Sequence, residues 1–494
     1  MRIIGIRNFL AQLSPGRSML DSSEVAHSSS EASEGGNWWS RPCGVRELLW
    51  IALPLIASTA SWSMTSFVDR LFLFWYSPEA MAAALPAGML HFTLLCFPIG
   101  LASYLNTFVA QYDGANRPEQ IGAVIRKGVI AGSFLIPAYF LTIPLATWAF
   151  QMVGHSAEVQ LLEVRYFQIL TFGAGASVVS AAMSTFFTGR GKTMTSMFVE
   201  VGSCVLNVAL DALFIFGLCG EWLEGITGAA IATMLSQWFK VIAYAILLWR
   251  PAIGGEFGFL DPSRDEPHLL RRIFQYGSAS GFQVLLEIGT FTGFTFLMGR
   301  MGLTAMTAST LAVDVNSLTF VPLIGLGIGI STLVGREIGH GQPQRAAVAT
   351  WSGLMVAMVY AGGMGFTYFM APDFFLSAHA MGMEPSKFEE IRVLTIILLR
   401  FVAFFCVFDA MNLVAVSALK GAGDVRFILV VGAICSSLLL ALAVTFLWLD
   451  RIDVEGLWYA LTGWVILLTI AHWSRFFTGQ WRSKTVMETA TEAT

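Results

Sequence analysis

The sequence predicts an all-α polytopic membrane protein with twelve transmembrane helices in two parallel six-helix lobes. Three observations lead to this fold class: the composition, an internal repeat and a series of long apolar segments. Hydrophobic residues make up 55% of the 494 residues, only 13% are charged, and the mean hydropathy is +0.67. Because a soluble domain carries roughly 25% charged residues, this composition fits the lipid bilayer. The net charge of −4 argues against nucleic-acid binding.

The internal repeat relates residues 46–120 to residues 271–345 at a constant offset of 225 positions, without a gap. Its identical pairs include Ala87/Ala312, Ile99-Gly100-Leu101/Ile324-Gly325-Leu326, Thr107/Thr332, Gly114/Gly339 and Pro118/Pro343. A repeat of this length in an apolar chain is typical of a two-lobed transporter whose substrate site lies between the halves.

Twelve segments approach the length of about 20 predominantly apolar residues that a transmembrane helix needs. They are Leu48–Phe74, Ala80–Val109, Val129–Phe150, Tyr166–Phe187, Met194–Leu218, Ile226–Leu248, Ile273–Met298, Ala305–Val334, Ala347–Met370, Val393–Leu419, Phe427–Leu449 and Leu457–Phe477. The second and the eighth are overlong and correspond to each other in the repeat. We expect this pair to tilt or to project beyond the bilayer.

The segment 251–272, rich in proline, glycine and charged residues, separates six spans from six. It defines an amino-terminal lobe at 46–250, a cytoplasmic linker at 251–272 and a carboxyl-terminal lobe at 273–480. Because six is an even number, the lobes should be parallel repeats about a pseudo-twofold axis along the membrane normal. Residues 1–45 contain a stretch rich in serine, glutamate and glycine, which predicts a disordered cytoplasmic tail, and residues 481–494 are a second cytoplasmic tail.

Lysine and arginine are distributed unequally between the two sides of the predicted membrane. They gather at the chain ends and in the even-numbered loops, for example at Arg126, Lys127, Arg190, Lys192 and Lys420, whereas the opposite loops carry few. The positive-inside rule therefore places both termini in the cytoplasm of a multi-pass protein of the cell (inner or plasma) membrane.

Ionisable and amide side chains inside the spans are the candidate functional groups, because a charge at the bilayer centre costs about 3 kcal/mol on insertion scales. In the first lobe these residues are Asp69 on the first span and Glu200, Asn207 and Asp211 on the fifth. In the second lobe they are Glu287 on the seventh span, Asp314 on the eighth, and Asp409 and Asn412 on the tenth.

The spacing of Glu200, Asn207 and Asp211, at i, i+7 and i+11, places them on one helical stripe. Together with Asp69, this stripe predicts a site in the first lobe where oxygens converge on a small cation. A carboxylate in hydrocarbon could carry a proton instead. The alternative is that these groups join helices through hydrogen bonds. Under the repeat, Asp69 falls on Phe294 and Glu287 on Trp62, so each lobe has its own acids. This asymmetry favours a division of labour.

Several segments together resemble the multidrug and toxic compound extrusion (MATE) family, in its NorM-like branch. They are Ala52-Leu-Pro-Leu-Ile followed by Phe67-Val-Asp69, Asn207-Val-Ala-Leu-Asp211-Ala-Leu-Phe, and Phe408-Asp-Ala-Met-Asn412 followed by Ala418-Leu-Lys-Gly-Ala-Gly-Asp424. The resemblance covers about residues 46–480. It implies alternating access and the export of cationic amphiphiles, driven by inward flow of Na⁺ or H⁺.

The resemblance also implies roles for particular residues. Asp69, Asn207 and Asp211 match the amino-lobe cation site of the family, where Na⁺ could bind, and Glu287 and Asp409 match acids of the carboxyl lobe in the NorM-like branch. Glu200, Asp314 and Asn412 are further candidates. One departure is Arg70, which stands beside Asp69 where the family usually has a small or hydroxylic residue.

The sequence therefore predicts a secondary active antiporter that exports small organic cations in exchange for Na⁺ or H⁺, and it does not choose between these ions. We expect a monomer that needs no cofactor and is not an enzyme, because no catalytic constellation is visible in the sequence. The alternative is a lipid-linked oligosaccharide flippase of the same superfamily. Such a flippase needs several arginines to hold pyrophosphate, and only Arg70 and Arg400 are candidates.

Overall fold

A computed structural model describes residues 38–153, 155–250, 255–259, 261, 265–377, 385–448 and 453–488. Within these ranges the chain is helical and contains no strand, and twelve helices are long and apolar enough to cross a membrane. Most of the predicted amino-terminal tail, part of the linker and residues 489–494 lie outside the described residues. Residues 481–488, which the sequence assigns to a tail, pack against the helices, with Trp481 and Val486 buried.

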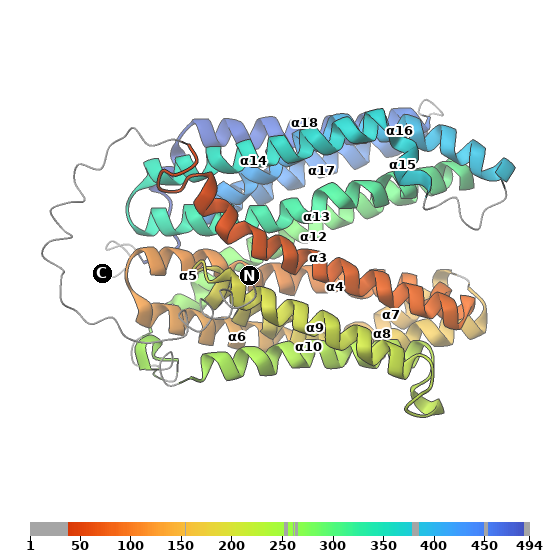
Figure 1. The fold of residues 1–494 in the computed structure, drawn as a ribbon, viewed down its shortest axis with the longest axis horizontal. Coiled ribbons are helices and arrows are strands. Elements are labelled where there is room, and N and C mark those ends of the chain that lie inside the picture. The colour runs from red at the N-terminus through yellow and green to blue at the C-terminus, as the bar shows by residue number, and fades with distance from the viewer. Residues whose placement is uncertain are drawn as a thin grey trace, which may run out of the picture.

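The helices divide into two lobes of six spans each (Figure 1). The amino lobe contains α3 (Val45–Tyr76), α4 (Pro78–Ser103), α5 (Leu105–Gly114), α6 (Pro118–Phe140), α7 (Thr142–Val153), α8 (Ala157–Thr188), α9 (Thr193–Phe214), the short η1 (Glu221–Leu223) and α10 (Ile226–Leu248). The carboxyl lobe contains α12 (Leu269–Arg300), α13 (Leu303–Gly339), α14 (Pro343–Met370), α15 (Pro372–Leu376), α16 (Pro385–Ala422), α17 (Val425–Trp448), α18 (Val454–Phe477) and the short η4 (Gln480–Ser483).

The helix boundaries repeat at the offset found in the sequence. The span formed by α4 and α5 begins at Pro78 and ends at Gly114, and its counterpart α13 begins at Leu303 and ends at Gly339. Both spans are 37 residues long, as expected for the overlong pair. The next helix begins in each lobe with a proline, Pro118 or Pro343. Proline is favoured at the first position of a helix, because the backbone N–H that it lacks would have no acceptor within the helix there.

The predicted bounds of the third span are wrong. The sequence places this span at 129–150, but α6 covers Pro118–Phe140 and the separate short helix α7 follows. Arg126 and Lys127 suggested a loop because they are charged, yet both lie inside α6. Their charges are compensated there: Asp265 pairs with both side chains, and Arg126 also donates to the Phe259 carbonyl (2.7 Å).

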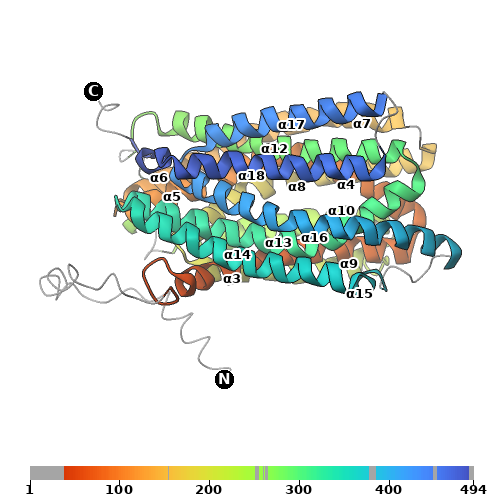
Figure 2. The same cartoon turned by 90° about the horizontal axis from the view of Figure 1, so that it is seen from above.

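The two ends of the bundle differ in how the lobes pack. We call the end that holds the start of α3, the end of α5 and Trp481 the terminal face; Figures 1 and 2 place α15 at the opposite, far end. At the far end, one hydrophobic cluster contains amino-lobe residues alone and another contains carboxyl-lobe residues alone. Toward the terminal face, the clusters are shared: Leu48 and Leu55 of α3 join the carboxyl-lobe core, and Leu269 and Ile273 of α12 join the amino-lobe core.

Reciprocal glycine contacts near the terminal face reveal the pseudo-twofold axis. A β-carbon on Gly114 would lie 2.0 Å from the carbonyl oxygen of Arg336, and one on Gly339 would lie 2.1 Å from that of Gln111. Gly114 and Gly339 are repeat partners, and so are Gln111 and Arg336. Contacts that exchange partners in this way are what twofold symmetry produces. Only glycine permits this close approach of the two backbones.

Hydrogen bonds between the lobes reinforce this seam. Asn106 donates to Thr332 Oγ1 (2.9 Å), Gln111 donates to the Gly421 carbonyl (2.9 Å), and Thr107 donates to the Lys420 carbonyl (3.2 Å). The lobes are therefore joined at the terminal face, while toward the far end each lobe packs around its own core.

Candidate functional site

Three polar side chains that the sequence singled out meet inside the amino lobe. Asp69 lies on α3, and Asn207 and Asp211 lie one turn apart on α9. With its amide oriented to suit its neighbours, Asn207 donates to Asp69 Oδ1 (3.0 Å) and to Asp211 Oδ2 (3.1 Å). Asp69 is 8% exposed and the other two are fully buried. The structure thus brings together the three residues that the stripe on α9 and the first-span aspartate suggested.

The two carboxyl groups of this cluster face each other. Asp69 and Asp211 both accept from the Asn207 amide, and their charges act on each other, so a proton between them relieves the repulsion of two ionised carboxylates. A small cation in that position would satisfy the same oxygens. Asp211 Oδ1 is buried and has no hydrogen-bond partner among the described residues. An unpaired buried acceptor of this kind is costly, so the cluster is suited to exchanging a proton or a cation.

Thr233 on α10 completes the cluster, and sequence reasoning missed it. Its hydroxyl donates to Asp69 Oδ2 (3.3 Å). Threonine is common in membrane helices, so nothing in the local sequence distinguishes Thr233 from its neighbours. We call Asp69, Asn207, Asp211 and Thr233 the amino-lobe cluster; it combines two carboxylates, an amide and a hydroxyl from three helices.

Glu287 on α12 and Asp409 on α16 lie in the carboxyl lobe, close enough for their charges to interact. Both are half-buried, and no hydrogen bond joins them directly among the described residues. Gln283 lies one turn before Glu287 on the same helix, and Gln283 Oε1 is buried without a partner among the described residues. The carboxyl-lobe acids therefore form a looser arrangement than the amino-lobe cluster.

Two basic groups beside these acids were not predicted. The sequence assigned Lys420 to a cytoplasmic loop, but it lies within α16, and its charge interacts with that of Glu287. His472 on α18 pairs through Nδ1 with Asn412 Oδ1 (2.8 Å), while its Nε2 is buried without a partner in the described chain. Because an amide oxygen only accepts, Nδ1 carries the proton and Nε2 is a free acceptor. We call Gln283, Glu287, Asp409, Asn412, Lys420 and His472 the carboxyl-lobe cluster.

The remaining candidates lie elsewhere. Glu200 does not join the amino-lobe cluster; its carboxylate pairs with Lys240 Nζ (3.3 Å) and accepts from the Tyr244 hydroxyl (3.5 Å), both on α10. Asp314 on α13 is exposed, unlike the half-buried acids of the carboxyl-lobe cluster. Of the three further candidates, only Asn412 takes part in a cluster around the predicted acids.

The two arginines that could have held a pyrophosphate are exposed and lie in different lobes. Arg70 donates through Nε to the carbonyl of Ser66 on its own helix (2.9 Å). Its charge acts on Asp69, but the two side chains form no ion pair within the described chain. The guanidinium of Arg400 lies 6.0 Å from the ring centre of Phe369. These positions do not form a paired phosphate clamp.

Comparison with known proteins gives a consistent result over both lobes. The family model described as MatE matches residues 54–213 and 279–447. The Probable multidrug resistance protein NorM of Synechocystis sp. is 23% identical over 392 residues, which cover 79% of this chain and 84% of that protein. Multidrug resistance protein NorM of Vibrio cholerae is 24% identical over 390 residues, covering 77% of this chain and 82% of that protein.

Solved structures share the fold. An outward-facing multidrug resistance MATE family transporter of the MOP superfamily superposes with a TM-score of 0.80 at 18% identity, covering 89% of this chain and 97% of that one. A MOP superfamily transporter from Pyrococcus furiosus, described as having a binding pocket of reverse polarity, gives a TM-score of 0.79 at 19% identity, covering 89% and 97% of the two chains.

Proposed function

Because the chain belongs to the MatE family, we propose that it is a secondary active antiporter that exports small organic cations in exchange for Na⁺ or H⁺. The amino-lobe cluster binds the coupling ion, and the carboxyl-lobe cluster contributes to substrate binding. Its relatives include proteins named as multidrug resistance proteins and multi-pass MATE transporters, so transport of small organic compounds is the family's shared activity.

The observation that carries this proposal is the pairing of Asp69 with Asp211 inside the amino lobe. Two acids, held by Asn207 and buried in an apolar helical bundle, are expensive to maintain unless they exchange a charged partner. The free oxygen on Asp211 gives that partner a ligand. Carboxylate and hydroxyl oxygens suit a hard monovalent cation as well as a proton.

Alternating access follows from the asymmetry between the two ends. The described state is closed at the terminal face by shared cores, glycine contacts and hydrogen bonds. The lobes rock against each other, so that this seam opens in the opposite state and the clusters become accessible from each side in turn. The terminal face is cytoplasmic, as the positive-inside rule requires. The protein acts in the cell membrane with both termini inside, and the described state faces outward.

Transport by purified protein in liposomes tests the proposal. The fluorescent cation ethidium is present at equal concentration on both sides of the membrane, and a Na⁺ gradient or a pH gradient is imposed separately. We expect one gradient to drive ethidium against its own gradient, and we expect an organic anion of similar size to be left behind.

Two results would contradict the proposed function. One is an unchanged ethidium distribution under both gradients with correctly inserted protein. The other is a preference for anions or lipid pyrophosphates that depends on Arg70 and Arg400, which would favour the flippase. Replacement of each arginine by glutamine provides the matched control.

A further inference from the structure

The terminal face carries two clasps that occupy symmetry-related positions but use different chemistry. On one side of the pseudo-twofold axis, the guanidinium of Arg336 on α13 pairs directly with the Glu47 carboxylate on α3. At the repeat offset of 225, Glu47 corresponds to Arg272 and Arg336 corresponds to Gln111. The second side therefore presents an arginine and a glutamine, two side chains that cannot form an ion pair.

A segment from the carboxyl-terminal end of the chain fills this second position. We call Lys484–Met487 the C-terminal strap. The Val486 N–H donates to Gln111 Oε1 (2.9 Å), and the Val486 carbonyl accepts from Arg272 Nη1 (3.0 Å). One residue of the strap thus bridges the two residues that correspond to the ion pair on the other side.

Gln111 is the centre of this clasp. Its side chain is fully buried, and its oxygen also accepts from the Thr485 hydroxyl (2.9 Å). Its amide nitrogen donates to the Gly421 carbonyl of α16 (2.9 Å). A single amide therefore connects α5 of the amino lobe, α16 of the carboxyl lobe and the strap, and every polar atom of that amide has a partner.

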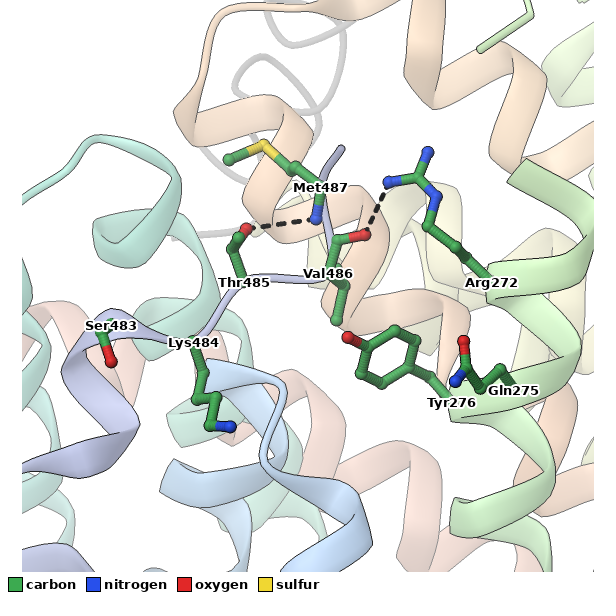
Figure 3. A pocket seen from close by; sticks show the side chains of 8 residues that line it. All are labelled: Arg272, Gln275, Tyr276, Ser483, Lys484, Thr485, Val486 and Met487. Carbon is green, nitrogen blue, oxygen red and sulfur yellow. Dashed lines mark hydrogen bonds between the residues drawn. The ribbon is translucent and has the colours of Figure 1, made fainter. Parts of the chain in front are cut away.

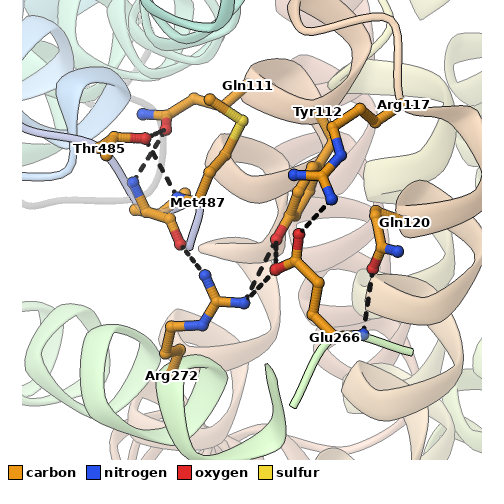
Figure 4. A network of polar contacts seen from close by, with 9 residues as sticks. Gln111, Tyr112, Arg117, Gln120, Glu266, Arg272, Thr485 and Met487 are labelled. Carbon is orange, nitrogen blue, oxygen red and sulfur yellow. Dashed lines mark hydrogen bonds and ion pairs between the residues drawn. The ribbon is translucent and has the colours of Figure 1, made fainter. Parts of the chain in front are cut away.

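Arg272 is held in place from the amino-lobe side (Figure 4). Its guanidinium pairs with Glu266, which also accepts from the Tyr112 hydroxyl (2.5 Å) and pairs with Arg117 (2.9 Å). This network fixes the arginine so that Nη1 points at the strap. Figure 3 shows the strap forming one wall of a pocket of about 200 Å³, with Arg272, Gln275 and Tyr276 on the other.

The strap and the residue Trp481 before it are anchored in different hydrophobic cores. Trp481 is fully buried in the core that is mainly carboxyl-lobe, and Val486 is 1% exposed in the core that is mainly amino-lobe. Four residues lie between them, and the five Cα–Cα steps from Trp481 to Val486 span roughly 17 Å when fully extended. The connection is too short to follow a wide separation of the two cores.

From these contacts we propose that Gln111 and Arg272 are positioning residues of the transport cycle, which dock the C-terminal strap across the seam as a lock of the closed terminal face. The inference rests on the proposed function, because it assigns the lock to one state of the antiport cycle. Opening of this face withdraws Val486 from its core and breaks the bonds to Gln111. The clasp between Glu47 and Arg336 opens in the same step.

The test measures the opening directly by pulsed electron resonance. Spin labels are attached to cysteines at Glu119 and Gln344, repeat partners near the terminal face, in a background that lacks the exposed Cys219. A chain that ends after Ser483 lacks the strap. We expect the ratio of the open to the closed population, taken from the distance distribution, to rise about tenfold. A factor of this size is expected because the shortened chain loses the buried Val486 side chain and its hydrogen bonds. A chain that ends after Glu488 keeps the strap and should match the full-length protein.

Substitutions keep the test informative if the shortened chain does not fold. Thr485→Val removes one donor to Gln111, and Gln111→Met removes both functions of the amide, whereas Gln111→Glu keeps the acceptor for the strap. We expect the open population of the terminal face to increase by different amounts in these variants, and to increase most in Gln111→Met. Distance distributions in these variants that equal those of the full-length protein would overturn the lock. If the unmodified protein shows the expected closed distances but does not transport ethidium, the result counts against the proposed function instead.

Discussion

The amino-lobe and carboxyl-lobe clusters contain two acids each, but they hold them in different ways. Asp69 and Asp211 are almost fully buried, and both accept a hydrogen bond from Asn207. Glu287 and Asp409 are half-buried and interact only through their charges, with the ammonium of Lys420 nearby. The first cluster is compact and carries no basic group among its members. The second is looser and contains its own cation.

This difference suggests that the two clusters bind different ligands. A compact set of oxygens selects for a small ion, because a larger cation would have to separate α3 from α9. A looser arrangement of acids suits an organic cation, and Lys420 then leaves the two ionised acids with one unit of net negative charge. Such an arrangement would take up one positive charge in each cycle.

The largest expected effect comes from the amino-lobe cluster. We expect Asp211→Asn to lower ion-driven ethidium transport by about 100-fold, because a charge-assisted contact contributes up to roughly 3 kcal/mol. Transport is measured in liposomes with matched amounts of inserted protein. Asp314→Asn, which changes an exposed acid of α13, serves as the control and should retain most activity. Normal ion dependence in Asp211→Asn would show that the two aspartates only join helices.

A smaller effect is expected in the carboxyl lobe. Glu287→Gln and Asp409→Asn should each lower transport by about tenfold, and the double variant should be little worse than either one, since coupled residues are not additive. The readout is the dependence of initial efflux rates on ethidium concentration. Strictly additive losses, or full efflux in both single variants, would show that these acids act independently.

The mildest effect is expected from the internal cation. Lys420→Gln removes a repulsive charge, so we expect the KM for a monovalent organic cation to fall by about fivefold, while release and kcat become slower. Lys420→Arg keeps the charge and should behave like the unmodified protein. A higher KM in Lys420→Gln would mean that the lysine supports the acids and does not compete with the substrate.

The repeat and the apolar segments were sufficient to predict twelve helices, two lobes and the overlong pair, because hydrocarbon forces each crossing to be a long helix. The assumption that charged residues lie in loops misplaced the start of α6 and assigned Lys420 to a loop. In both cases a charged residue lies inside a helix: Asp265 of the linker compensates Arg126, and Glu287 lies near Lys420. Such compensation comes from residues distant in sequence.

Prediction of the site residues from the sequence was limited in a similar way. Asp69, Asn207 and Asp211 stood out because acids and amides are rare in apolar spans and because two of them share a helix stripe. Thr233, His472 and Gln111 did not stand out. Their roles depend on partners from other helices, or on the chain end that docks at Gln111. A single sequence contains no signal for those pairings.

Equilibrium binding of the coupling ion to purified variants tests the division of labour most directly. Binding of radioactive sodium, or proton uptake at fixed pH, is measured alongside ethidium binding in Asp211→Asn and in Asp409→Asn. The proposal predicts that Asp211→Asn loses the ion but still binds ethidium, and that Asp409→Asn binds the ion but has weakened ethidium binding. The opposite pattern, or equal loss of both ligands in both variants, would contradict it.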